Sequence, residues 1–391
     1  MATESFNTLS VHAGEDLDDH FGALSVPIYS ASVFAFPDAD EGAAIHNEVK
    51  PGYYYGRLGN PTTAALEKVM ARLENAESAI AFSSGMAAVT AAVLSVCRSG
   101  DHIVAPASMY STATNLFHYL EDRFDIETAF INAITAENYR GAARKNTKLF
   151  WLETPSNPLM QITDLRKVSN ISKELGITTV ADNTFATLYN QRPLDCGIDA
   201  VIHSATKYLS GHSDLTAGVL AGNKNIVERA RHECGKLFGG NIAPQVSWLV
   251  MRGIKTLGLR MERHNYNASA LTNMFKGNPK VRAVYYPGLE SHPNHEIARC
   301  QMRGFGGMVG LDVGSNESAK VLINSLKLCK IATSLGGVET VIQHSASMTH
   351  ATLTREERAA AGISDGLLRL SVGIEDIDDL THDFDQALAK I

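Results

Sequence analysis

Short apolar runs alternate with longer stretches of helical spacing through the middle of the chain. Apolar residues recur every three or four positions in Ala64–Leu73, Met86–Cys97 and Leu165–Leu175, which predicts amphipathic helices. The apolar runs are four or five residues long and are typical of buried strands: Ala79–Phe82, His102–Ala105, Glu127–Ile131, Leu149–Leu152, Thr178–Ala181, Ala200–His203 and Gly218–Gly222. This alternation predicts an α/β fold with a mostly parallel seven-stranded sheet covered by helices.

The first 60 residues follow a different pattern. Aromatic residues, prolines and glycines occur there without regular spacing, as in Pro51–Arg57. Such a segment cannot easily close a hydrophobic core of its own. We therefore expect residues 1–60 to form an arm that packs on a neighbouring subunit, and residues 61–243 to form the large domain.

The pattern changes again after Ala243. A long helical stretch from Pro244 to about Phe275 looks like a connector, and strands are expected at Met308–Val313 and Leu367–Val372. Glu375–Ile391 reads as a closing helix. Residues 244–391 are therefore expected to form a smaller C-terminal α+β domain.

Composition narrows the classes of function. The 391 residues are 45% hydrophobic and 20% charged, with a formal net charge of −7, which supports a sizeable core and argues against nucleic-acid binding. We see neither a membrane-spanning apolar run nor a secretory signal in the first 16 residues. Five scattered cysteines without a CxxC pair argue against a disulfide framework or a metal site, so we expect a cytoplasmic protein.

Polar residues that follow the predicted strands suggest a ligand site, because ligands of open α/β sheets gather at the carboxyl ends of strands. Ser83–Met86 follows the first strand and opens a helix, whose free N–H groups favour a phosphate, although a simple helix cap would look the same. Tyr110 follows the second strand and could lie on a planar ring or serve only in packing. Asn157 lies between Pro155 and Pro158, which fix a turn and could aim its side chain inward, although an ordinary loop would look the same.

Two further strand ends carry more specific chemistry. Asp182 can pair with a pyridinium nitrogen, although a helix-capping aspartate is equally consistent with its position. Ser204 and Thr206 can bind phosphate oxygens, and Lys207 can form an imine. Together these residues are the parts that pyridoxal 5′-phosphate requires. A dinucleotide or nucleotide site lacks support, because neither a G-x-G-x-x-G motif nor a P-loop follows the early strands.

Nearly the whole chain resembles the Cys/Met-metabolism family of pyridoxal-phosphate enzymes, which includes methionine γ-lyases, cystathionine lyases, cystathionine γ-synthases and homoserine-ester sulfhydrylases. The most specific match is Asp199–His212, around Lys207. The other matching segments are Tyr55–Thr62, Ser84–Ala88, Glu153–Pro158, Arg252–Leu257, Ser334–Thr340 and Arg369–Asp376.

The resemblance implies an aminotransferase-like fold of type I and a role for each matching residue. Lys207 would carry the cofactor and transfer protons, Asp182 would pair with the ring nitrogen, and Tyr110 would stack on the ring and act as an acid or base. The phosphate would be held by Gly85, Met86, Ser204 and Thr206. The neighbouring subunit would add Tyr55 and Arg57, which implies an obligate dimer and, usually in this family, a homotetramer. The substrate would be bound by Asn157, Ser334, Arg369 and Thr112, with Arg369 as a bidentate partner of the α-carboxylate.

The resemblance also implies γ-elimination on a small sulfur-containing amino acid. The segment Glu339–His350 favours the methionine γ-lyase and cystathionine branch, which predicts conversion of methionine to 2-oxobutanoate, ammonia and methanethiol. Thr333 stands where many cystathionine enzymes have glutamate, and Thr112 stands where methionine γ-lyases usually have cysteine. A γ-replacement transferase or a cystathionine γ-lyase therefore stays an alternative, and a non-catalytic binding protein is a remote one.

Overall fold

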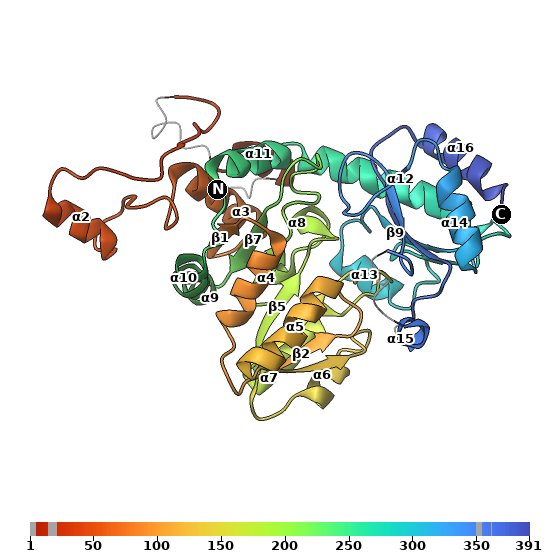
Figure 1. Cartoon of the computed structure of the whole chain (residues 1–391), viewed down its shortest axis with the longest axis horizontal. Helices are drawn as coiled ribbons and strands as arrows, with labels where there is room; N and C mark the ends of the chain where they lie inside the picture. Colours follow the sequence, from red (N-terminus) through yellow and green to blue (C-terminus); the bar gives the residue numbers. More distant parts are fainter. Residues whose placement is uncertain (1–4, 15–21, 349–353, 361) are drawn as a thin grey trace.

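The computed structural model describes residues 5–14, 22–348, 354–360 and 362–391 (Figure 1). Parts of two segments named above lie outside the described residues. They are residues 1–4 and 15–21 of the N-terminal arm, and Thr349 and His350 of the segment Glu339–His350. One lobe contains the large sheet, and a second lobe lies at the far end of a long helix, α12 (Figure 1). The segment that carries helix α2 projects away from both lobes (Figure 1).

The large sheet has seven strands in the order β1-β7-β6-β5-β4-β2-β3. Strand β7 is antiparallel to both of its neighbours, and the other adjacent strands run parallel. The strands are β1 (Ser78–Phe82), β2 (His102–Pro106), β3 (Glu127–Ile131), β4 (Thr147–Glu153), β5 (Thr178–Asp182), β6 (Ala200–His203) and β7 (Gly218–Gly222). The prediction of a mostly parallel seven-stranded sheet is confirmed, and every predicted strand lies within one or two residues of its observed bounds.

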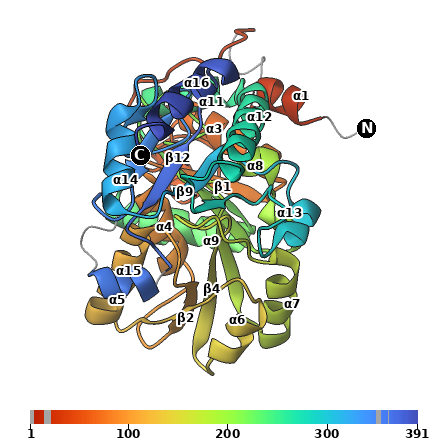
Figure 2. The same cartoon turned by 90° about the vertical axis from the view of Figure 1, so that its right-hand side faces the viewer.

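Alternating side chains of the strands pack into separate layers. Ile202 of β6 points toward the core that contains helices α4 and α5, whereas Val201 packs with helices α3 and α11 on the other face. Near the other edge, Phe150 of β4 packs against α7 (Leu165–Leu175). Figure 2 shows α5 and α7 on opposite sides of β4. Because both faces are covered, the inner strands β6 and β7 are buried along their whole length, as expected for strands inside such a sheet.

The helices complete the layers and the connections between them. The N-terminal half contains α1 (Phe6–His12), α2 (Ala39–His46), α3 (Pro61–Glu74), α4 (Gly85–Leu94), α5 (Ser111–Phe124), α6 (Glu137–Ala142), α8 (Thr187–Asn190) and a 3₁₀ turn (Pro193–Cys196). The C-terminal half contains α9 (Lys224–Arg229), a π-helical turn (Ala230–Gly235), α10 (Lys236–Phe238), α11 (Pro244–Ile254), α12 (Leu257–Lys276), α13 (His295–Gln301), α14 (Asn316–Ser325), α15 (Arg355–Ala360) and α16 (Ile377–Leu388).

The second lobe is built around a five-stranded, mainly antiparallel sheet in the order β10-β11-β12-β9-β8. Its strands are β8 (Ala283–Tyr285), β9 (Met308–Asp312), β10 (Lys330–Ile331), β11 (Val341–His344) and β12 (Leu367–Ser371). Residues of this sheet share a core with α12, α14 and α16. The lobe has the α+β character expected from the sequence.

The expected connector is two helices rather than one. Thr256 has φ −110° and ψ 6°, which separates α11 from α12. Val250 and Ile254 of α11 belong to the core of the large lobe, together with Leu66 of α3. The division of the chain at residues 60 and 243 stays a prediction.

Within the described ranges, no helix is long and apolar enough to cross a membrane. In the same part of the chain, no group of three or more His, Cys, Asp or Glu side chains is arranged to hold a metal ion.

Candidate active site

A cavity of about 450 Å³ lies at the carboxyl ends of the central strands of the large sheet and reaches residues of the second lobe. Eleven of the thirteen residues expected at the site line it: Gly85, Met86, Tyr110, Thr112, Asn157, Asp182, Ser204, Thr206, Lys207, Ser334 and Arg369. The structure therefore brings together residues that are up to 284 positions apart in sequence (85 to 369).

Lys207 lies in the turn after β6, with its side chain in the cavity. Its Nζ donates a hydrogen bond to Ser334 Oγ at 2.7 Å. Burial, and secondly the nearby positive charge of Arg369, lower the pKa of Lys207 to about 8. The amine can therefore lose its proton near neutral pH, as a lysine that attacks a carbonyl group must.

The start of α4 and the end of β6 approach each other very closely. A Cβ atom at Gly85 would lie 2.8 Å from both Cβ and Oγ of Ser204, so glycine is required there. Ser84 caps the helix by accepting a hydrogen bond from Ala87 N at 3.1 Å. The N–H groups of Gly85 and Met86 belong to the first turn, which has no intrahelical acceptor for them. This end of the cavity fits a phosphate group.

Asp182 is the last residue of β5 and lies beside the end of β4. Its Oδ1 accepts a hydrogen bond from Thr184 N at 2.9 Å. Burial raises the pKa of this carboxyl group, although the contacts with Thr184 and the charge of His203 oppose the shift. A buried carboxylate at this place gains stability from a positive partner, which a protonated pyridine nitrogen would provide.

Arg369 on β12 is held by groups from three segments. Its Nη1 donates to Asn157 Oδ1 at 3.2 Å, and its Nη2 donates to Ser334 O at 2.7 Å. Gln343 lies opposite Arg369 on β11, and its amide oxygen, when turned toward Arg369, accepts from Nη2 at 2.9 Å and from Nε at 3.0 Å. Arg369 is 5% exposed and has no carboxylate partner among these contacts, which leaves its charge available to a bound anion.

Tyr110 lies just before α5 and is 42% exposed, with Thr112 in the first turn of the same helix. The backbone N–H of Tyr110 donates to Glu153 Oε2 at 2.8 Å. Both Tyr110 and Thr112 line the cavity, as does Thr333 on the segment before Ser334.

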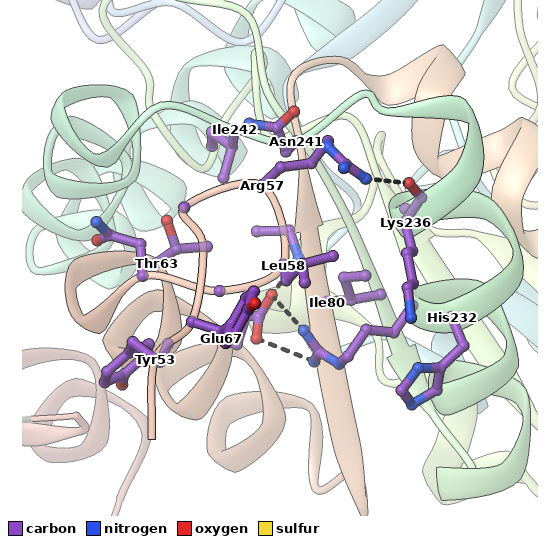
Figure 3. A pocket seen from close by; sticks show the side chains of 18 of the residues that line it. Tyr53, Arg57, Leu58, Thr63, Glu67, Ile80, His232, Lys236, Asn241 and Ile242 are labelled. Atoms are coloured by element: carbon purple, nitrogen blue, oxygen red, sulfur yellow. Dashed lines mark hydrogen bonds and ion pairs between the residues drawn. The ribbon is translucent and has the colours of Figure 1, made fainter. Parts of the chain in front are cut away.

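Tyr55 and Arg57 do not line this cavity. Arg57 lines a second cavity of about 280 Å³, between the arm and the large lobe, and its Nη1 donates to Lys236 O (Figure 3). The ion pair between Glu67 and Arg231 also lines this second cavity (Figure 3). Within one chain, the structure therefore separates Tyr55 and Arg57 from the other expected site residues.

Sequence reasoning missed two polar residues of the site. Glu153 belongs to the matching segment Glu153–Pro158, and its position directly after the fourth predicted strand is the signal that could have marked it as a site residue. Gln343 had no such signal, because its relation to Arg369 depends on the register between β11 and β12.

The type I fold, the amine of Lys207, the buried carboxyl of Asp182 and the open helix terminus at Gly85 fit pyridoxal phosphate and define a pyridoxal-phosphate-dependent enzyme. The chain belongs to the family described as Cys/Met metabolism PLP-dependent enzyme, whose model matches residues 7–389.

Relatives and solved structures agree with this assignment. The L-methionine gamma-lyase of Fusobacterium nucleatum subsp. nucleatum is 44% identical, with 100% of both chains covered. The cystathionine gamma-lyase of Bacillus subtilis is 45% identical, with 98% of this chain and 99% of the relative covered. The crystal structure of cystathionine gamma-lyase from Lactobacillus plantarum, complexed with L-serine, has a TM-score of 0.92 at 36% identity and covers 99% of each chain.

Proposed function

We propose that this protein catalyses γ-elimination on sulfur-containing amino acids, with methionine as the preferred substrate, giving 2-oxobutanoate, ammonia and methanethiol. The observation that carries the choice of substrate is the uncharged character of the cavity around Thr112 and Thr333. Among the described lining residues, the carboxyl side chains are Glu153 and Asp182, and both lie at the strand ends. The distal ammonium of cystathionine therefore has no nearby acidic partner at Thr333.

The cofactor, when bound, supplies an electron sink for the charge that develops at the α-carbon. We assign its attachment to Lys207, its ring nitrogen to Asp182 and one ring face to Tyr110. The phosphate is assigned to the N–H groups and hydroxyls of Gly85, Met86, Ser204 and Thr206. The fit of Gly85 to Ser204 and the lowered pKa of Lys207 support these assignments.

Substrate binding and proton transfer follow from the same geometry. Arg369 binds the α-carboxylate, with Asn157 and Ser334 keeping its guanidinium in place. Lys207 removes the proton from the α-carbon, since its amine is neutral above about pH 8. The phenol of Tyr110 transfers a proton near the departing γ-substituent, and Thr112 contacts that end of the substrate.

We further propose that the active unit is a homodimer and that two such dimers form a homotetramer. Within each dimer, Tyr55 and Arg57 contact the phosphate bound by the neighbouring subunit. Large apolar side chains exposed near the arm support this assembly, because isolated chains rarely leave so many uncovered. They include Leu24, Val33, Val49, Leu237 and Phe238, each at least 69% exposed. All five cysteines are free, which is consistent with a cytoplasmic location.

A panel of substrates tests the proposed activity. Purified protein loaded with pyridoxal phosphate is incubated with methionine, homocysteine or cystathionine, and 2-oxo acid, ammonia and thiol are measured. We expect the highest kcat/KM for methionine. The proposal is refuted if none of the three substrates releases an oxo acid.

A γ-replacement transferase is the second candidate, since Thr112 replaces the usual cysteine of methionine γ-lyases. It predicts product only when an activated homoserine ester and a thiol are present together. The same panel, repeated with such an ester and with or without added thiol, separates the two activities.

A further inference from the structure

The carboxyl groups of Glu153 and Asp182 lie side by side at the end of the large sheet. The two residues are register partners at the last positions of the parallel strands β4 and β5, so their side chains leave the same face. Glu153 is 5% exposed and lines the cavity. The proposed function gives Asp182 a role and leaves this second buried carboxyl group without one.

Each oxygen of Glu153 accepts a hydrogen bond from a different backbone segment of the site. Oε2 accepts from the N–H of Tyr110 at 2.8 Å, and Oε1 accepts from the N–H of Asn157 at 2.9 Å. Tyr110 immediately precedes α5, whereas Asn157 lies in the turn after β4. One side chain therefore fixes the separation between the two segments.

The two fixed residues act on different parts of the bound molecules. We assign Tyr110 to a face of the cofactor ring, and the side chain of Asn157 accepts from Arg369, which we assign to the substrate carboxylate. A shift of either backbone segment would therefore move the ring contact and the carboxylate contact relative to each other. Such displacements reduce the rate even when no reacting group is removed.

The closeness of the two carboxyl groups also affects the pKa of Glu153. Burial, and secondly the neighbouring Asp182, raise the pKa of Glu153 to about 8, whereas the two N–H donors and Arg369 oppose the rise. Burial, and secondly the charge of Glu153, raise the pKa of the Tyr139 phenol. Each of the two carboxyl groups therefore favours its protonated form more than an exposed carboxyl group does.

We propose that Glu153 is a positioning residue of the active site, whose two oxygen atoms hold the backbones of Tyr110 and Asn157 at a fixed separation around the cofactor. The proposal rests on the proposed function for the roles of Tyr110 and Asn157. It does not depend on which sulfur-containing amino acid is the substrate.

The first test is the variant Glu153→Gln, which keeps the size of the side chain but presents an NH₂ group to one of the two N–H donors. We expect about tenfold weaker binding of pyridoxal phosphate to the cofactor-free protein and about tenfold lower kcat. We also expect an altered visible circular dichroism of the bound cofactor.

Asp383→Asn is the matched control. Asp383 is also buried and accepts hydrogen bonds from backbone N–H groups, those of Lys327, Leu328 and Cys329 at 2.8 to 3.0 Å, but it lies in the second lobe. It should lower thermal stability and leave cofactor affinity and the dichroism signal unchanged. The proposal is overturned if Glu153→Gln binds and orients the cofactor like the wild-type protein, or if Asp383→Asn changes these properties equally.

Amide hydrogen exchange in the wild-type protein provides a test that needs no variant. The N–H groups of Tyr110 and Asn157 should exchange slowly in the cofactor-free protein, because both are bonded to a buried carboxyl group. Rapid exchange of both would overturn the proposal. Failure of the substrate panel, by contrast, would refute the proposed activity and leave these two measurements unaffected.

Discussion

Lys207 differs from a surface lysine in two ways: its side chain is half-buried, and its amine must be neutral to react. Because its pKa is lowered to about 8, the amine is mostly protonated below that pH and mostly neutral above it. We therefore predict that the rate of pyridoxal phosphate binding to the cofactor-free protein rises with pH and levels off above about pH 8. Stopped-flow absorbance across this range checks the prediction, and a rate that falls with pH would contradict it.

Lys207→Ala should lower kcat by about 10² to 10⁴. The measurement is steady-state release of oxo acid from methionine by protein reconstituted with cofactor.

Arg369 contributes mainly to binding, because its guanidinium contacts the substrate carboxylate in our proposal and no reacting bond. Arg369→Lys removes the planar geometry that Asn157 and Ser334 hold in place. The loss of a charged hydrogen bond corresponds to about 1.5–3 kcal/mol, so KM should rise about 10- to 100-fold with a smaller change in kcat. Arg299→Lys, at an exposed ion pair with Glu296, is the control and should leave both constants unchanged.

Some of these side chains could be predicted from sequence, and others could not. Asp182 follows directly after the predicted strand Thr178–Ala181, and Lys207 lies four residues beyond the end of the predicted strand Ala200–His203. Parallel strands bring such positions to one edge. Gln343 meets Arg369 through the register of an antiparallel pair, and nothing local in the sequence encodes that register. Ser334 meets Lys207 only after the second lobe is packed on the first.

Helix α12 carries three buried polar side chains on one face, Arg260, His264 and Asn267. Arg260 donates to Tyr208 O and Gly253 O, both at 2.7 Å, close to the turn that holds Lys207. His264 Nδ1 lies 2.7 Å from Val372 O, just beyond β12. The helix therefore connects the Lys207 turn to the strand of Arg369.

Arg260→Met should destabilise the protein by about 2–4 kcal/mol, since it removes the charged hydrogen bond to Gly253 O and leaves the buried Tyr208 O without its donor. Arg263→Met, on the exposed side of the same helix, should change stability by less than about 0.5 kcal/mol. Denaturant unfolding of the cofactor-free variants measures both changes, and equal midpoints for the two would contradict the role of Arg260.

The division between α11 and α12 shows where helical periodicity loses its predictive value. Apolar spacing continues through Lys255 and Thr256, so the sequence indicates one helix. The helix ends there because α11 must pack on α3 in the large lobe, whereas α12 extends toward the second lobe. Tertiary packing decides this boundary, whereas strands buried on both faces could be predicted from short apolar runs in the sequence.

The arm carries two expected site residues that do not line the Lys207 cavity of their own chain, Tyr55 and Arg57. Arg57 lies outside the Lys207 cavity of its own chain, and Tyr55 is 41% exposed. If both residues complete the site of a neighbour, each site requires two chains. A chain mutated at Lys207 and a chain mutated at Arg57 can then complement each other in a mixed dimer.

We predict that Lys207→Ala and Arg57→Ala, each of low activity as a homodimer, recover activity when the two chains are co-expressed. Random pairing makes half of the dimers hybrid, and each hybrid has one site with both an intact Lys207 and an intact Arg57, so about a quarter of the wild-type activity should return. Chains with different affinity tags allow the hybrid to be isolated and assayed. If Arg57 acts within its own chain, no hybrid contains an intact site, and the isolated hybrid will be no more active than its parents.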